Sequence, residues 1–231
     1  LVLDEADRML DMGFIPDIKR IIRATPHKEE RQTLLFSATF NQDILNRANQ
    51  WTHQPHTVEI ATKFEASENI EQHAFLVADV DKLHLTNRII SHWQLSKVIV
   101  FVNRRDIGRE VFTVLQKQGL AVGLLSGEID QRRRLSTLEK FKNGQLEVLV
   151  ATDVAGRGLH INDISHVINF NLPEDPEDYV HRIGRTGRAG AKGTSISFIG
   201  EEDAFALPAI EELIKGKLNC VYPPEELLAS Q

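Results

Sequence analysis

Short apolar runs alternate with helical patterns along most of this chain, and this alternation limits the folds that are open to it. Six runs after residue 72 have the length and composition of buried strands: Ala74–Ala78, Val98–Val102, Val122–Leu125, Val148–Ala151, Val167–Phe170 and Ser195–Ile199. Between them, segments such as 107–115 and 135–141 carry apolar residues at helical spacing. The pattern predicts an α/β fold, in which a parallel sheet is flanked by helices and ligands bind at the carboxyl ends of the strands.

The first 56 residues show the same pattern in a shorter form. Leu1–Leu3 and Thr33–Phe36 are predicted strands, and helices are predicted from Pro16 and over Asn41–Gln50. Two strand–helix units are too few to close a parallel α/β domain. Because residues 57–71 are polar and weakly patterned, we expect a partial domain at 1–56, a linker at 57–71 and a complete domain at 72–231.

Charge and cysteine content restrict the class of protein. The formal net charge of −6 argues against a protein that coats nucleic acid through bulk charge. Arg182, Arg185, Arg188 and Lys192 nevertheless gather in a stretch without acids, so phosphate contacts are expected in a local patch. Cys220 is the only cysteine, which excludes an internal disulfide and fits a cytoplasmic protein.

Two polar motifs follow the two predicted strands of the first segment. Asp4, Glu5 and Asp7 come directly after an apolar run, where carboxylates suit a magnesium ion and an attacking water. The alternative is a solvated turn at a strand end. Ser37 and Thr39 end the next strand and can bond a carboxylate such as that of Asp7, or can simply cap a helix.

Further motifs in the second segment suit phosphate. Gln131 and Arg134 open a predicted helix after the turn at Gly127, and helix starts with arginine anchor phosphate groups. The alternative is a solvated basic face. Thr152 is followed by a loop with two glycines, which lets the backbone approach a phosphate closely.

The segment 181–188 spaces three arginines at intervals of three residues, with Gly184 and Gly187 between them. The glycines weaken a helix, so we predict a turn or a frayed helix end. Arginines here suit phosphoryl charge, and the alternative is surface arginines that pair with the preceding acids.

Taken in order, these motifs resemble those of the DEAD-box RNA helicases over essentially the whole chain: Val2–Asp7, Ser37–Thr39, Gln131–Arg134, Ala151–Gly158 and His181–Arg188. Residues 160–213 look most similar to the bacterial RhlB-type branch. The resemblance implies two RecA-like domains, a partial one at 1–56 and a complete one at 72–231, and it implies ATP-driven separation of short RNA duplexes or remodelling of RNA–protein assemblies.

The resemblance also implies roles for individual residues. Asp4 would hold Mg²⁺ through water, Glu5 would activate the hydrolytic water, and Arg185 and Arg188 would reach the γ-phosphate. The resemblance further implies three sets of contacts. Coupling between the domains would involve Asp7, Ser37, Thr39, His181 and Arg182. ATP would be bound by Arg157, Gly158 and His160, and the RNA backbone by Gly127, Gln131, Arg134 and Thr152.

Two departures from the family pattern qualify these expectations. His160 stands where most members have an aspartate that contacts the ATP ribose. No Gly-x-x-x-x-Gly-Lys-Ser/Thr loop occurs in the 231 residues, so we expect the carboxyl-terminal portion of a longer helicase, inactive as an ATPase by itself. The alternatives are a non-catalytic module that binds RNA or a partner, such as a nuclease of RNA degradation, and a DNA translocase.

Overall fold

The computed structural model describes residues 1–11, 14–37, 42–59, 69–156, 161, 164–187 and 191–228. The chain forms two compact units, Leu1–Ala61 and Thr62–Gln231. The division between them lies inside the segment 57–71 that the sequence assigns to a linker. Both units combine parallel strands with helices, so the predicted α/β class is confirmed.

In its described residues, unit 1 has one pair of parallel strands and three helices: β1 (Val2–Leu3), α1 (Ala6–Asp11), α2 (Ile15–Arg23), β2 (Leu34–Leu35) and α3 (Gln42–Trp51). The helix predicted from Pro16 begins one residue earlier, and Asn41, the first residue of the other predicted helix, lies outside the described residues. A small core of Leu3, Ile18, Ile44 and Trp51 joins these elements.

Unit 2 is built on a sheet of seven strands in the order β5-β6-β4-β7-β8-β3-β9. Every neighbouring pair runs parallel, as predicted. The strands are β3 (Ile70–Leu76), β4 (Val98–Val102), β5 (Val122–Leu125), β6 (Val148–Thr152), β7 (His166–Asn169), β8 (Gly193–Ile199) and β9 (Cys220–Val221).

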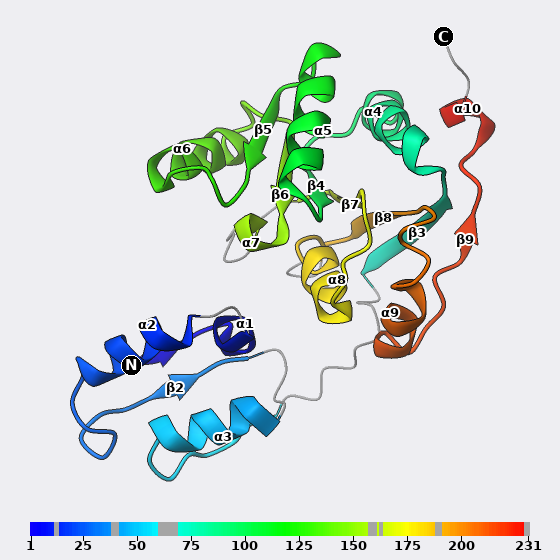
Figure 1. Ribbon diagram of the computed structural model, residues 1–231. Coiled ribbons are helices and arrows are strands. Elements are labelled where there is room, and N and C mark those ends of the chain that lie inside the picture. Colours follow the sequence, from blue (N-terminus) through cyan, green and yellow to red (C-terminus); the bar gives the residue numbers. More distant parts are fainter. Residues whose placement is uncertain are drawn as a thin grey trace. The chain divides into compact units, whose positions relative to one another are not determined.

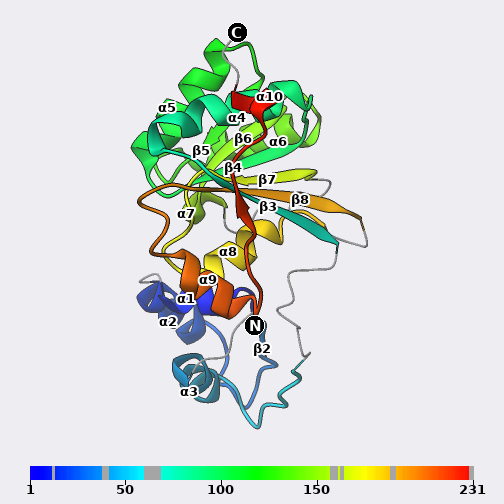
Figure 2. The ribbon, with the colours of Figure 1, turned by 90° about the vertical axis from the view of Figure 1, so that its right-hand side faces the viewer.

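Helices cover both faces of this sheet (Figures 1 and 2). They are α4 (Lys82–His92), which follows a short 3-10 turn at Asp79–Asp81, α5 (Arg105–Lys117), α6 (Gln131–Lys142), α7 (Asp153–Gly156), α8 (Pro176–Ile183), α9 (Leu207–Leu213) and α10 (Glu225–Leu228). Figure 2 shows α4, α5 and α10 on one side and α7, α8 and α9 on the other. In the part of the chain that the structure describes, every helix is too short or too polar to span a membrane.

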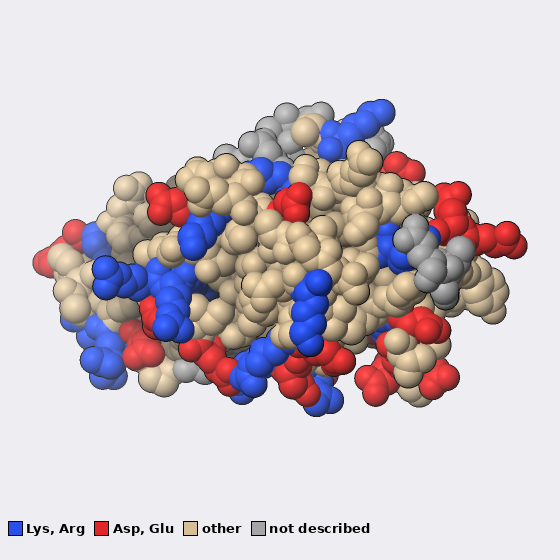
Figure 3. All heavy atoms as spheres, turned by 90° about the horizontal axis from the view of Figure 1, so that it is seen from above, with Lys and Arg blue, Asp and Glu red and all other residues tan. Residues whose placement is uncertain are grey.

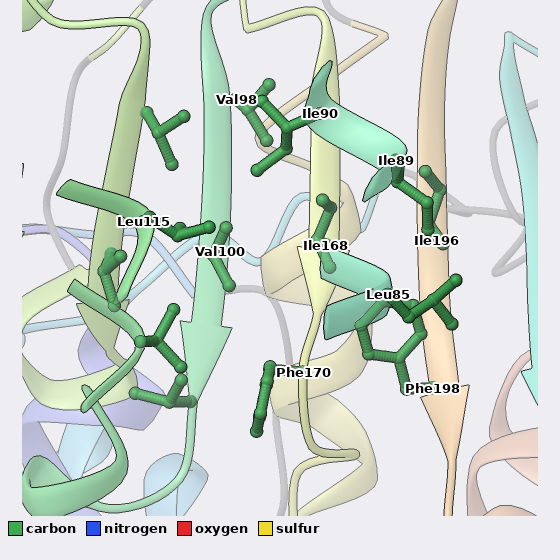
Figure 4. Close-up of a cluster of buried hydrophobic side chains, with 14 of the residues drawn as sticks. Leu85, Ile89, Ile90, Val98, Val100, Leu115, Ile168, Phe170, Ile196 and Phe198 are labelled. Carbon is green, nitrogen blue, oxygen red and sulfur yellow. The ribbon is translucent and has the colours of Figure 1, made fainter. Parts of the chain in front are cut away.

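The alternation of side chains along β4 explains why two cores form. Val98, Val100 and Val102 point to the face covered by α4 and α5, whereas Ile99 and Phe101 point to the opposite face. Figure 4 shows the first core, in which side chains of α4 and α5 meet those of β4, β7 and β8. A strand buried on both faces carries a continuous apolar run, and such runs were the sequence signal for the inner strands.

The first strand of unit 2 differs from its prediction. The expected strand was Ala74–Ala78, and the expected linker included residues 70 and 71, but β3 begins at Ile70 and ends at Leu76. The start of β3 was not predicted because Glu71, Gln72 and His73 are polar and interrupt the apolar pattern. β9 pairs with β3 only at Ala74 and Phe75, so the first half of β3 has a strand partner on one side and tolerates polar side chains.

Tyr179 of α8 ties that helix to β3, because its hydroxyl donates a hydrogen bond of 2.8 Å to Oε1 of Gln72. Burial of the ring raises the pKa of Tyr179 to about 12. Between pH 10 and pH 12 the unfolded chain therefore loses this proton while the folded chain keeps it. The free energy of unfolding should fall by up to about 1.4 kcal/mol per pH unit in this window.

The replacement Tyr179→Phe should remove this dependence, at a cost of about 1 kcal/mol near neutral pH for the lost hydrogen bond. Urea unfolding of both proteins between pH 9 and pH 11.5 measures the difference. The two proteins differ at this residue alone, so equal slopes would show that burial does not raise the pKa of Tyr179.

Candidate functional site

The acidic motif of unit 1 forms a sharp turn between β1 and α1. Asp4 leaves the strand as an exposed residue, and its Oδ1 accepts a hydrogen bond of 2.9 Å from the backbone N–H of Glu5. Glu5 has a φ of 50°, which lies in the left-handed region that non-glycine residues rarely adopt. The N–H of Ala6 donates to the carbonyl of Phe36 at 3.0 Å and fixes the turn to the end of β2. Backbone strain of this kind is frequent at functional sites.

The two motifs predicted to meet in unit 1 lie side by side. Asp7 is buried, and its backbone N–H donates to Oγ of Ser37 at 3.1 Å. The parallel register of β1 and β2, with Leu3 opposite Leu35, brings the two strand ends together. Thr39, the third predicted member, lies outside the described residues.

In unit 2, the arginine motif His181–Arg188 begins within α8, and the helix ends at Ile183, inside the motif. The side chain of Asp175 caps the helix by accepting from the N–H of Glu177 at 2.9 Å, and Gly184 follows the last helical residue. The N–H of Arg185 then bonds to the carbonyl of Arg182 at 3.1 Å, which forms a tight final turn. Gly187 follows this turn and has a φ of 67°, a conformation that favours glycine. Of the two predicted forms, a turn or a frayed helix end, the structure has the turn.

Arg182 has a different environment from the one that the sequence suggested for these arginines. It is 2% exposed, and its guanidinium binds both carboxylate oxygens of Asp153 at 2.6 Å. It pairs with this residue after β6 rather than with the acids that precede α8. The alternative of a surface ion pair is therefore wrong for Arg182.

A small pocket of unit 2 adjoins this ion pair. It is lined by residues of β4, α7, α8 and the turn after α8: Phe101, Asp153, Gly156, Asp178, His181, Arg182 and Arg185. His181 is partly exposed there, and Arg185 is 7% exposed. A Cβ atom on Gly156 would lie 2.7 Å from Cε1 of Phe101, so only glycine allows α7 to pack this closely. Arg188 lies outside the described residues.

The predicted RNA residues divide between an exposed helix start and a buried strand end. Gln131 is the first residue of α6, as expected, and Gln131 and Gly127 are exposed. Asp130, which sequence reasoning did not single out, caps this helix by accepting from the N–H of Arg133 at 3.0 Å. Thr152 is largely buried at the end of β6, so little of its side chain is open to a ligand.

Several polar neighbours of the site were also missed. Glu128 accepts from Arg105 at 3.0 Å and from Arg109, which links the turn before α6 to the start of α5. Asp153 lies in the motif Ala151–Gly158, for which the sequence analysis considered only the threonine and the glycines. A charged residue directly after a buried strand was the available signal for it. The predicted ATP residues Arg157, Gly158 and His160 lie outside the described residues.

Magnesium was expected at Asp4 through water. Among the described residues, no group of three His, Cys, Asp or Glu side chains is placed to hold a metal ion. Mg²⁺ usually keeps several waters and needs only one or two carboxylates plus phosphate oxygens. The exposed carboxylate of Asp4 at a strand end fits this mode of binding, whereas an all-protein cage does not.

Comparison with known families gives two matches that follow the two units. The DEAD/DEAH box helicase family matches residues 1–47, and the helicase conserved C-terminal domain matches residues 81–190. The chain is 60% identical over 228 residues to an ATP-dependent RNA helicase RhlB of Pseudomonas aeruginosa, and the alignment covers 99% of this chain. It is 47% identical over 230 residues to the protein of that name in Shewanella baltica. The chain spans 57% and 52% of the lengths of these relatives.

Solved structures give the same result. S. cerevisiae Dbp5 bound to RNA and ADP BeF3 superposes with a TM-score of 0.83 at 31% identity, over 96% of this chain and 59% of that one. The E. coli DEAD-box protein SrmB, solved with regulator of ribonuclease activity A, has a TM-score of 0.65 at 35% identity and is covered over 94% of its length. By its motifs, its parallel sheet and these relatives, the chain belongs to the DEAD-box family of RNA helicases, in the RhlB-type branch.

Proposed function

We propose that this chain works in an ATP-dependent RNA helicase that couples RNA-stimulated ATP hydrolysis to the separation of short duplexes or the remodelling of RNA–protein assemblies. The observation that carries the proposal is the position of the charged motifs. Each follows a parallel strand or ends a helix at the carboxyl edge of a sheet, where such folds bind nucleotides. Relatives that are named ATP-dependent RNA helicases support it.

The chemistry assigned to unit 1 follows from the turn after β1. Asp4, exposed at the strand end, would hold Mg²⁺ through water, and the bound ion would offset charge on the phosphate oxygens. Glu5 follows Asp4 in the strained turn before α1, and its carboxylate is proposed as the base that orients the attacking water. The buried Asp7 anchors the turn through Ser37.

In unit 2, Arg185 is assigned to phosphoryl charge. It lies with His181 in the pocket beside α7, and the segment that follows α7 contains the residues proposed for ATP: Arg157, Gly158 and His160. Arg188 is proposed as the second phosphate contact. Arginine suits this task because its planar guanidinium forms two parallel hydrogen bonds with phosphate oxygens.

RNA is assigned to the exposed start of α6. Figure 3 shows a face on which basic and acidic side chains are mixed in small groups, so bulk attraction does not explain RNA binding. Gln131 and Arg134, with the turn at Gly127 and the end of β6 at Thr152, are proposed to contact the sugar–phosphate chain. Binding would then depend on a few defined phosphate contacts.

The proposal extends to a partner and a compartment. The SrmB structure contains a regulator of ribonuclease activity, which supports a partner from the machinery of RNA degradation for this chain as well. A single, partly exposed cysteine fits a reducing cytoplasm. Co-purification of the tagged protein with and without ribonuclease treatment would separate a protein partner from one held by RNA.

ATP hydrolysis tests the proposed function. The protein encoded by the whole gene should hydrolyse ATP at a rate that single-stranded RNA raises, and single-stranded DNA should stimulate it much less. The 231-residue chain, which contains no phosphate-binding loop of the Gly-x-x-x-x-Gly-Lys-Ser/Thr form, should show no turnover. Equal stimulation by DNA would favour a translocase, and absence of turnover from the whole gene product would favour a binding module.

The binding-module alternative rests on the RNA candidates of unit 2, which are independent of the acids of unit 1. In either case, Arg134→Ala should weaken RNA binding and reduce the slope of log Kd against log salt by about 1. Fluorescence anisotropy at several salt concentrations measures both quantities. Lys117→Ala, which changes an exposed cation at the end of α5, is the control. An unchanged slope for Arg134→Ala would remove this arginine from the RNA site.

A further inference from the structure

We infer that the loops after β8, β3 and β9 form a docking surface for a basic segment of a partner protein that carries apolar anchor side chains. This surface, which we call the loop surface, consists of residues 79–81, 200–206 and 222–226. It contains none of the residues assigned to ATP or RNA. The inference gives a place and a chemistry to the partner in the proposed function, and it rests on that partner binding rather than on ATP hydrolysis.

The three loops lie side by side because their strands are neighbours in the sheet. Ile199, the last residue of β8, lies opposite Leu76, the last residue of β3. β9 pairs with the other edge of β3, with Val221 opposite Phe75, so Tyr222 comes next and lies level with the end of β3. The chain therefore leaves three adjacent parallel strands at the same edge of the sheet (Figure 1).

Each loop presents one large apolar or aromatic side chain almost entirely to water. Phe205 is 90% exposed, Val80 is 87% exposed and Tyr222 is 78% exposed. In the described part of unit 2, every other large apolar side chain is less exposed than these three. Single exposed apolar residues are ordinary on a protein surface, whereas several in neighbouring loops mark an interaction site. Aromatic residues are also enriched among those that carry the binding energy of protein interfaces.

A buried ion pair holds two of the loops together. Lys82 directly follows the first loop, its ammonium is 1% exposed, and it pairs with Asp79 at 2.6 Å and with Asp203 of the second loop. The carboxylate of Asp203 also accepts from the N–H of Gly200 at 3.0 Å, and its carbonyl accepts from the N–H of Ala206 at 3.0 Å. The turn that carries the exposed aromatic ring is thus fixed before a partner arrives, which lowers the entropy that binding costs.

The loop surface is acidic. Its three segments contain no lysine or arginine, and Lys82 offsets two of their acids. Arg104 lies within electrostatic reach of Glu202, but it pairs with Asp106. The acids that are exposed and not offset by Lys82 are Asp81, Glu201, Glu202, Glu225 and Glu226.

These charges decide between the possible occupants. The acids repel the phosphates of RNA. A second copy of the chain would bring like charges face to face, because a two-fold contact joins the same surface of both subunits. A protein segment with lysine or arginine is attracted instead, and its apolar side chains can cover Phe205, Val80 and Tyr222. A basic, partly apolar segment of a partner protein is therefore the occupant that fits.

Peptide binding to the protein encoded by the whole gene tests the loop surface. The probe is a fluorescein-labelled peptide of lysine and leucine, patterned as an amphipathic helix, and fluorescence anisotropy measures its Kd. The wild type should bind it, and Phe205→Ser should weaken binding by about tenfold or more, as for an aromatic anchor. Val80→Ser should cause a smaller loss. Glu201→Lys/Glu202→Lys should also weaken binding, most strongly at low salt.

Matched substitutions in unit 1 control for a general loss of apolar or acidic surface. Val58→Ser changes a valine that is 81% exposed, and Glu29→Lys/Glu30→Lys reverses two adjacent exposed glutamates. Both should bind the peptide as the wild type does. A peptide of lysine and serine lacks the anchors, and a peptide of glutamate and leucine has the wrong charge, so the wild type should bind both weakly. All variants should keep the wild-type melting temperature and RNA-stimulated ATP hydrolysis.

Equal peptide affinity in the loop-surface variants and their controls, or no binding by the wild type, overturns the inference. Loss of RNA binding in Phe205→Ser would overturn it in favour of RNA, and a wild-type dimer that Phe205→Ser dissociates would overturn it in favour of a second copy. Each of these results leaves the proposed ATP hydrolysis intact. Absence of RNA-stimulated hydrolysis in the wild type contradicts the proposed function without changing the peptide result.

Discussion

Replacing Arg185 by alanine is expected to lower kcat for ATP hydrolysis by about three to five orders of magnitude, the range that arginine fingers supply. Arg185 lies in the pocket with His181 and Asp178 at the end of α8, and Gly187 turns the chain sharply just after it. Loss of the guanidinium removes charge stabilisation that matters most in the transition state. RNA affinity should change little, because the RNA candidates lie on α6 and at the end of β6.

Single-turnover hydrolysis at saturating RNA, in the protein encoded by the whole gene, measures this effect. Arg185→Lys should restore only a small part of the rate, since an ammonium cannot form the paired hydrogen bonds of a guanidinium. Lys217→Ala, at an exposed site after α9, is the control. Hydrolysis near the wild-type rate in Arg185→Ala would exclude Arg185 from phosphate stabilisation.

The largest expected effect on stability comes from Lys82, the first residue of α4. Its ammonium is 1% exposed and pairs with Asp203, which is also buried, and with Asp79 at 2.6 Å. Lys82→Met keeps the apolar stem but leaves Asp203 as a buried charge. Within the described part of the chain, its carboxylate then keeps the N–H groups of Leu172 and Gly200 as its hydrogen-bond donors. The free energy of unfolding of unit 2 should fall by about 3 to 5 kcal/mol.

Urea unfolding of the chain in a Trp51→Phe background measures this loss, because Trp93 of unit 2 is then the only tryptophan. The double variant Lys82→Met/Asp203→Asn should recover a large part of the stability, since the unpaired charge is gone. Arg104→Met breaks an exposed pair with Asp106 and should change the stability far less, because water screens that pair. An equally small effect of Lys82→Met would show that water solvates Asp203 in the variant.

Strands of unit 2 that carry continuous apolar runs were predictable from sequence, both inside the sheet, as for β4, and at its edge, as for β5. Val98–Val102 and Val122–Leu125 were predicted with their observed bounds. β3 and β9 were not, since β3 carries polar residues in its first half and β9 is only two residues long. Apolar runs therefore reveal strands whose side chains are mostly buried, including β5 at the edge of the sheet, much better than strands that are partly polar or very short.

The site shows a similar limit. Motif spacing brought Asp7 and Ser37 together correctly, because consecutive parallel strands end at the same edge. The separate environments of Arg182 and Arg185 were not predictable, although they are three residues apart. Arg182 is the one that bonds within the protein because its partners Asp153 and Asn103 are nearby in the fold. These partners lie 29 and 79 residues earlier in the chain.

The order of the strands has a consequence for synthesis on the ribosome. β4, β5, β6 and β7 are consecutive in the chain and form one side of the sheet, so they can assemble as they emerge. β3 emerges before them, yet its main partner β8 follows about 120 residues later. At about 5–20 residues per second, β3 waits for roughly 6 to 24 s. A nascent chain that stalls before residue 193 therefore exposes the apolar side chains of Ile70, Ala74 and Phe75, and truncated products of this kind should aggregate.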